Sequence, residues 1–186
     1  MASKYPPAPF VRSWWVEPNT LLAGFFPGDH DDMTAEEKLS ALLDCGVTTF
    51  VNLMEPDEVN NNGERFRSYV PMLQELAAQR GLHAECVRFP IRDMGIPDME
   101  MMIRILDAID DAASRGKTVY VHCWGGVGRT GTVVGCWLAR HGIAVGKDAL
   151  ERIEALRRAQ HQQIFWMPSP QTAEQREFVQ WWERGV

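Results

Sequence analysis

The chain has 186 residues, of which 45% are hydrophobic and 24% charged, and its net charge is −6. This length suits one domain around one core, and the composition is ordinary for a soluble globular protein. An acidic balance without a Lys/Arg cluster argues against nonspecific binding to nucleic acid or to acidic membranes. No apolar run reaches the ~20 residues of a membrane span. The first residues lack the apolar segment of a signal peptide, so we expect a cytoplasmic protein.

Strands and helices alternate along the predicted chain. Residues 1–19 are rich in proline and aromatic side chains, and we expect an irregular arm there, packed on a single domain of residues 20–186. The pattern then predicts, in chain order, a strand at 20–25, a helix at 34–45 capped by Thr34 and Glu37, a strand at 48–53 and a helix ending near residue 80. A strand at 83–90 and a long helix capped by Asp98 follow. The last predicted elements are a strand at 118–123, a helix at 129–142 and two further helices separated by residues 167–172. This order predicts an α/β fold with a mainly parallel central β-sheet and helices on both faces.

The chain holds four cysteines, Cys45, Cys86, Cys123 and Cys136, and none forms a Cys-x-x-Cys pair. This spacing excludes a zinc ribbon or a thioredoxin-type motif. A chain of this size has no need of disulfide staples, so we expect free thiols in a reducing compartment. The acidic stretch 28–32 is expected to be a solvated turn before a helix rather than a metal site.

The stretch Val119–Gly131, VYVHCWGGVGRTG, carries the clearest functional signal. Ligands of parallel sheets bind at the carboxyl ends of the strands, and Cys123 is expected at such an end. The glycines that follow let the backbone turn tightly and point its N–H groups inward beside a helix N-terminus, which is an anion-binding arrangement. Arg129 adds a planar fork for two phosphate oxygens, and the same positive field favours the thiolate of Cys123. Cys123 alone would suit a buried core position, but its combination with the glycines and Arg129 favours a nucleophile.

The segment HCWGGVGRTG resembles the signature loop of the cysteine-dependent protein tyrosine phosphatases, H-C-x-x-G-x-x-R-[ST]. The matching positions are His122, Cys123, Gly126, Gly128, Arg129 and Thr130. The sequence is more similar to the compact dual-specificity type than to the receptor-like type, because it lacks the W-P-D tripeptide. A nucleotide-binding P-loop is excluded, since Arg129 stands where that motif needs lysine.

This resemblance implies hydrolysis in two steps without a metal or other cofactor. The Cys123 thiolate would attack phosphorus, and water would hydrolyse the phosphocysteine. Thr130 is expected to hydrogen-bond the sulfur when it leaves, and His122 to order the loop as a supporting residue. The substrate phosphate is expected to bind to the residues of the loop, which are Trp124, Gly125, Gly126, Val127, Gly128 and Arg129. The sequence leaves open whether the Trp124 indole packs behind this loop or shapes its rim.

The family takes the proton for the leaving group from an aspartic acid on a loop before the cysteine. The segment IRDMGIPD offers Asp93 and Asp98. We predict Asp93 as the general acid, since it lies in a loop after a strand that could close over a substrate. Asp98 follows Pro97 and suits a helix N-cap.

A second, shorter resemblance lies near the C-terminus, where Gln171 and Gln175 match the glutamines of the Q-T-x-x-Q loop of larger tyrosine phosphatases. There the glutamines orient the hydrolytic water. The alternative is that Ser169 or Thr172 caps the last helix while Gln175 is a solvated helix residue.

The loop interior WGGVG has no lysine, whereas phosphoinositide phosphatases of this superfamily commonly carry lysines there. We therefore predict a phosphatase for phosphotyrosine proteins or one of dual specificity. A phosphatase for a small phosphorylated metabolite, an inositol phosphate or an RNA 5′ end is the alternative enzyme, and a non-catalytic phosphate-binding module is the alternative of another class. The expected partner is a phosphorylated protein or a small phosphate monoester, not nucleic acid or a membrane. The oligomeric state is open.

Cys86 lies on a predicted strand that we expect to neighbour the strand of Cys123. A disulfide between these two cysteines is one hypothesis, and a buried thiol is the default. Arsenate reduction also uses a C-x5-R loop, but it would need further cysteines near the loop, and Cys86 is the one candidate.

Overall fold

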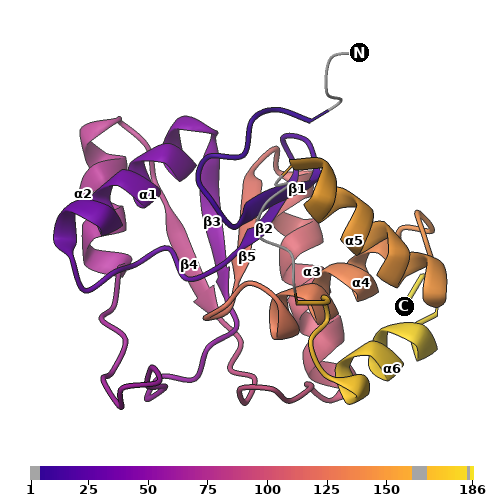
Figure 1. Cartoon of the computed structure of the whole chain (residues 1–186). Helices are drawn as coiled ribbons and strands as arrows, with labels where there is room; N and C mark the ends of the chain where they lie inside the picture. Colours follow the sequence, from indigo (N-terminus) through magenta and orange to yellow (C-terminus); the bar gives the residue numbers. More distant parts are fainter. Residues whose placement is uncertain (1–4, 161–166, 184) are drawn as a thin grey trace.

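A central sheet organises the computed structural model, which describes residues 5–160, 167–183 and 185–186. Within these residues the sheet has five strands, shown in Figure 1. In spatial order they are β1 (Ser13–Glu17), β2 (Leu21–Gly24), β5 (Thr118–His122), β3 (Val47–Asn52) and β4 (Glu85–Arg88). β1 pairs antiparallel with β2, and the other neighbours pair in parallel. The prediction of a mainly parallel sheet is confirmed.

Helices cover both faces of this sheet (Figure 1). On one side lie α1 (Asp32–Asp44) and α2 (Val70–Gln79). On the other side lie α3 (Met99–Ser114), α4 (Gly128–Arg140), α5 (Lys147–Gln160) and α6 (Ala173–Trp181). Across the described part of the chain, none of the helices has the length and apolar character needed to cross a membrane.

The middle of the core is formed by β5 and α4, which follow each other in the chain. Every residue of β5 is buried, and so is every residue of α4 from Gly128 to Ala139. A helix that is buried all round must be packed on all sides, and α4 contacts α3, α5 and α6 as well as the sheet. The loop between β5 and α4 therefore starts and ends in rigid structure.

Residues 13–17 depart from the sequence prediction, because they form β1 rather than part of an irregular arm. The side chains of Trp14 and Trp15 are 1% exposed. The outer edge of β1 is closed by Gln160, whose Oε1 accepts from Trp15 N at 2.7 Å while its Nε2 donates to Trp15 O at 2.9 Å. An edge strand whose free backbone groups are satisfied in this way is stable. A side chain 145 residues away does this, so the local pattern did not predict it.

The start of α1 also differs from the prediction, which placed Thr34 as the cap. Asp31 is the N-cap, with an extended backbone, and its carboxylate accepts from Thr34 N at 2.9 Å and from the Thr34 hydroxyl at 2.6 Å. Since both the backbone N–H and the hydroxyl of Thr34 donate to Asp31, Thr34 lies within the first turn and the helix begins earlier.

We predict that Trp14→Ala lowers the free energy of unfolding by about 3–5 kcal/mol, because it leaves a large cavity under β1. Trp181→Ala is the matched control, since Trp181 is 83% exposed. Its effect should stay within about 0.5 kcal/mol. Urea denaturation measures both, and equal effects of the two substitutions would show that residues 13–17 do not belong to the core.

Candidate functional site

The loop from Cys123 to Gly128 joins the carboxyl end of β5 to the N-terminus of α4. Gly126 has φ +69°, and a Cβ there would lie 2.5 Å from the backbone of Gly24. Only glycine fits this close approach. Val127 is the N-cap of α4 and makes no side-chain cap, and the first turn holds no acidic residue. The first N–H groups of α4 are thus available to an anion, as the sequence predicted.

Cys123 lies at the bottom of a pocket of about 380 Å³, and the residue is 3% exposed. The Thr130 hydroxyl lies 3.1 Å from Cys123 Sγ and 3.5 Å from Gly24 O. A hydroxyl has one proton to donate, and the shorter contact, made to the larger sulfur atom, receives it. A thiolate at this place would accept that hydrogen bond. The sequence placed both residues correctly relative to each other.

Arg129 is buried at the side of the pocket and held by several acceptors. Its Nη1 and Nη2 donate to the two carboxylate oxygens of Glu58 at 2.6 and 2.7 Å, and Nη1 also donates to Ile91 O at 3.0 Å. Asp93 Oδ1 lies 2.9 Å from Nη2. Burial opposes the charge, but the hydrogen bonds that Arg129 donates to Glu58 and the neighbouring negative charges together outweigh it and raise the pKa of Arg129 above its usual value. The guanidinium is therefore a permanent cation with a fixed plane.

Glu58 was not identified from the sequence, because no local pattern in the polar stretch 55–64 distinguishes it from Glu55 or Asp57. In the structure the Glu58 side chain is 7% exposed. A buried carboxylate needs such a partner, and the bidentate pair with Arg129 satisfies both groups.

The two candidate acids separate as predicted. Asp93 lines the pocket, and its side chain is 47% exposed. Asp98 is the N-cap of α3 and accepts from Met101 N at 2.7 Å. Asp98 is thus engaged in the helix start, whereas Asp93 contacts Arg129 and lines the same pocket as Cys123.

His122 is buried and belongs to a hydrogen-bonded chain that the sequence did not reveal. Its Nδ1 lies 3.2 Å from Cys123 O, and its Nε2 lies 2.7 Å from the hydroxyl of Tyr69. The carbonyl can only accept, so Nδ1 carries the proton, Nε2 accepts, and Tyr69 donates. Burial lowers the pKa of His122 to about 3. The ring is therefore neutral and orders the peptide of Cys123, in keeping with a supporting position.

Cys86 ends the same chain, with Sγ 3.2 Å from the Tyr69 hydroxyl, and burial raises its pKa. The prediction that the strand of Cys86 neighbours that of Cys123 is wrong, because β3 lies between β4 and β5. Cys86 pairs with Phe50, which pairs with Tyr120. Two strand spacings of about 4.8 Å exceed the reach of a disulfide. A Cys86–Cys123 disulfide is excluded in this fold.

The C-terminal glutamines occupy different places. Gln171 lines the pocket of Cys123. Gln175 is fully buried: its Oε1 accepts from the backbone N–H groups of Gln171 and Thr172, and its Nε2 donates to Gly95 O at 3.0 Å. The alternative of a solvated Gln175 is wrong. Thr172 is the N-cap of α6, with Gln175 completing a capping box. Gln175 thereby ties α6 to the loop that carries Asp93.

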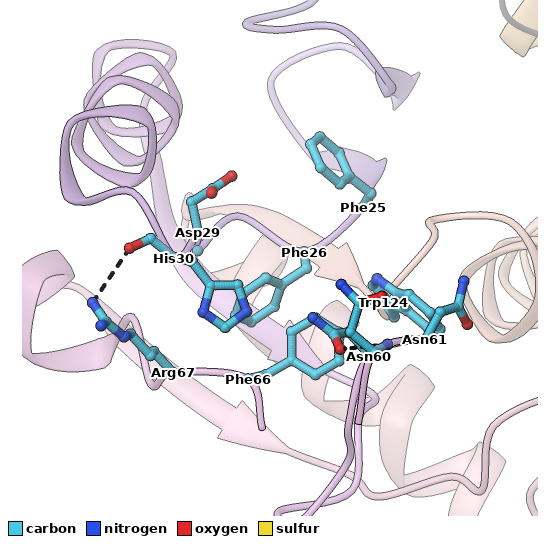
Figure 2. A pocket seen from close by; sticks show the side chains of 11 residues that line it. Phe25, Phe26, Asp29, His30, Asn60, Asn61, Phe66, Arg67 and Trp124 are labelled. Carbon is cyan, nitrogen blue, oxygen red and sulfur yellow. Dashed lines mark hydrogen bonds between the residues drawn. The ribbon is translucent and has the colours of Figure 1, made fainter. Parts of the chain in front are cut away.

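Two further residues shape the pocket. Arg12, which the sequence did not single out, reaches Gly125 O with Nη2 at 2.8 Å and lies 4.7 Å from the centre of the Phe25 ring. It adds a second cation to the lining of the pocket. The Trp124 indole packs edge-on against Phe66 at 5.5 Å. Trp124 lines both the Cys123 pocket and the neighbouring pocket that Figure 2 shows, which favours the rim over the back of the loop in the question left open by the sequence.

Within residues 5–160, 167–183 and 185–186, no group of three or more His, Cys, Asp or Glu side chains is placed to hold a metal ion. The groups that meet at the pocket are instead a thiol, two guanidinium groups, an aspartate and the N-terminus of α4. Together they form a site for a doubly charged anion beside a nucleophile.

We predict that Glu58→Gln lowers the free energy of unfolding by about 3 kcal/mol, because it leaves the buried Arg129 charge without its main partner. Inorganic phosphate should restore part of this loss by compensating the cation. Asp57→Asn is the control, since its partner Arg65 and Asp57 itself are both exposed. Urea denaturation with and without phosphate is the measurement; a loss no larger than that of the control would contradict the prediction.

The neutral buried His122 predicts a pH dependence of stability. Its pKa is about 3 in the folded protein and about 6.5 in the unfolded chain, so the unfolded state binds more protons between these values. The contribution of neutral His122 to the free energy of unfolding is fully present above pH 6.5. It decreases as the pH falls, by about 2 kcal/mol between pH 7 and pH 5. In His122→Gln this part of the slope should vanish, whereas exposed His83→Gln should retain it. Denaturant titrations at both pH values test this, and an unchanged slope in His122→Gln would refute it.

Comparison with known proteins also indicates a phosphatase. A family model described as PTP-SAK, Swiss Army Knife protein, DSP-PTPase phosphatase domain, matches residues 11–179. The putative tyrosine phosphatase 067L of Invertebrate iridescent virus 3 is 32% identical over 107 residues, 55% of this chain and 38% of that protein. The phosphatidylglycerophosphate phosphatase PTPMT1 of Arabidopsis thaliana is 28% identical over 145 residues, 77% of this chain and 37% of that protein.

The chain spans half or less of the length of several curated relatives that it matches. The solved structure of Tk-PTP in the active form superposes with a TM-score of 0.66 at 23% identity, covering 91% of this chain and 95% of the other. This likeness concerns the fold. With the family model matching most of its length, the chain belongs to the PTP-SAK family of DSP-PTPase phosphatase domains.

Proposed function

We propose that this protein hydrolyses phosphate monoesters through a phosphocysteine intermediate, as a protein tyrosine or dual-specificity phosphatase. The observation that carries the proposal is the position of Cys123 Sγ. It lies at the bottom of a pocket, hydrogen-bonded to Thr130 and beside the fixed cation Arg129 and the N-terminus of α4. Family membership supports the same reaction class.

In the first step, the Cys123 thiolate attacks phosphorus and displaces the alcohol or phenol. The backbone N–H groups of Trp124–Gly128 and the guanidinium of Arg129 bind the phosphate oxygens, whose charge they stabilise in the transition state. Glu58 and Ile91 O hold the plane of Arg129, so little reorganisation is needed when the phosphate arrives. His122 and Tyr69 keep the Cys123 peptide in place.

Asp93 is the proposed general acid, which gives its proton to the leaving oxygen. Its contact with Arg129 and its position in the lining of the Cys123 pocket support this role. A bound phosphate would compete for Arg129 and release Asp93 toward the leaving group. Gln175 supports this loop through Gly95 O.

In the second step, water attacks the phosphocysteine and the thiolate leaves. Thr130 stabilises the leaving sulfur through its hydroxyl. Gln171 is the proposed residue for orienting the water, because it lines the pocket. For Gln175 we propose a positioning role, since its amide oxygen already accepts two backbone bonds.

Phosphorylated proteins are the substrates we propose first. A small phosphorylated metabolite, an inositol phosphate or an RNA 5′ end is the second candidate, favoured by one observation: Arg12 adds a cation to a pocket that has no lysine in its loop. Rates for phosphotyrosine and phosphoserine peptides, inositol phosphates and a 5′-phosphorylated oligonucleotide separate these classes. A chain that binds phosphopeptides without any turnover would be the non-catalytic module.

We also propose that residues 20–186 act together with β1 as one phosphatase domain in the cytoplasm. Residues 1–4 of the expected arm lie outside the described residues. The four cysteines are free thiols, which supports a reducing setting.

For hydrolysis of para-nitrophenyl phosphate across pH, we predict that Cys123→Ser abolishes activity, since the nucleophile is lost. Asp93→Asn should lower kcat by about 10²–10⁴ with a poor leaving group such as an alkyl phosphate, and less with para-nitrophenol, which leaves without a proton. Asp98→Asn is the matched control: asparagine caps a helix as well as aspartate does, so α3 keeps its start and the variant should retain kcat. An active Cys123→Ser variant would contradict the mechanism, and loss of kcat in Asp98→Asn alone would move the acid to Asp98.

A further inference from the structure

A second pocket lies directly beside the first and has a different chemical character (Figure 2). Its volume is about 390 Å³, within the ~300–1,000 Å³ typical of ligand sites. Asn61 and Trp124 line both pockets. A molecule whose phosphate is bound at Cys123 could therefore extend over this shared rim into the second pocket.

Four large aromatic side chains line the second pocket: Phe25, Phe26, Phe66 and Trp124. Phe26 and Phe66 pack edge-on at 4.9 Å, and Phe66 packs edge-on against Trp124 at 5.5 Å. Figure 2 shows the rings of Phe26 and Phe66 beside His30, with Trp124 and Asn61 beyond them. Phe66 and Trp124 are only partly buried, so ring surface remains open to a ligand. Such rings favour another aromatic ring in edge-on or offset contact.

The charged groups that line this pocket already have partners of opposite charge among the described residues. Asp29 pairs with Lys38 at 3.0 Å, Arg67 with Asp32 at 3.4 Å, and His30 lies 3.8 Å from Glu64. A second phosphate or a carboxylate would find no unpaired cation there. The charge distribution favours an uncharged occupant.

The pocket is also preformed, because a hydrogen-bonded turn fixes its outer wall. Asn60 Oδ1 accepts from Asn62 N at 2.9 Å and from Glu64 N at 3.0 Å, and Val59 bridges to Arg65. The turn presents the exposed Asn61 and Asn62, whose side-chain amides make no hydrogen bond to other described residues. A free amide offers one acceptor and two donor hydrogens, which match the C=O and N–H of a peptide backbone.

From these observations we propose that the second pocket is a specificity subsite. It takes an uncharged aromatic side chain that neighbours the phosphorylated residue of a peptide substrate, while Asn61 binds the peptide backbone between the two residues. The proposal rests on the proposed phosphatase function and names which phosphoproteins that site prefers.

The test compares short phosphotyrosine peptides that differ only in Phe or Ala at one of the two positions on either side of the phosphotyrosine. For the wild-type protein, kcat/KM should be about tenfold higher with Phe at one of these positions. In Phe66→Ala the preference should fall below about twofold, because the aromatic wall is removed. Activity on the Ala peptides and on para-nitrophenyl phosphate, which is too short to reach the pocket, should change little.

Two further variants make the result specific. Phe178→Ala removes another partly buried aromatic side chain, which stacks on Trp182 and lines neither pocket, and should retain the preference. Asn62→Trp fills the pocket from its exposed wall without removing any core contact and should abolish the preference. A wild-type protein without preference for Phe, or a preference that survives both Phe66→Ala and Asn62→Trp, would overturn the proposal.

Failure of the phosphatase function itself would look different, since para-nitrophenyl phosphate would then not be hydrolysed either. In that case the preference is measured as a ratio of affinities instead of a ratio of kcat/KM values. The affinities of Cys123→Ser for the Phe peptide and for the Ala peptide are compared by fluorescence anisotropy. Equal affinities for the two peptides would refute the subsite, and a preference for Phe that Phe66→Ala removes would support it.

Discussion

The buried ion pair between Arg129 and Glu58 is the interaction on which the rest of the site depends. A guanidinium that is 1% exposed on its side chain is tolerated only because a carboxylate and a carbonyl satisfy it. These partners come from two loops that follow β3 and β4, whereas Arg129 begins the helix that follows β5. One charge thus fixes three strand ends relative to each other, and the anion-binding loop lies where they meet.

The same arrangement explains why the loops around the pocket form one unit. The segment 58–66 holds Arg129 through Glu58 at one end and lines the second pocket through Phe66 at the other. The loop of Asp93 contacts Arg129 on one side and is tied to α6 through Gln175 on the other. A substrate phosphate that displaces Asp93 from Arg129 would therefore act on segments that also decide which neighbouring side chain can be bound.

Charge is distributed unevenly between the two pockets, and this division has a chemical reason. The first pocket concentrates Arg12, Arg129 and the N-terminus of α4 around one thiol, which suits an anion with two charges. In the second pocket the charged groups are paired and the surface is aromatic. An overall net charge of −6 is compatible with anion binding because the positive field is local.

The sequence by itself determined the α/β order of elements, the loop of residues 122–130 and the separation of Asp93 from Asp98, because these depend on local periodicity, glycine positions and capping signals. Only the tertiary structure decided that Glu58 holds Arg129, that Arg12 reaches the loop and that Gln175 is buried, since each contact joins residues at least 70 positions apart. It also decided that residues 13–17 form a strand and that β3 separates Cys86 from Cys123. The physical reason is the same in each case: burial and charge compensation are settled by which segments meet in space, and no local pattern encodes that.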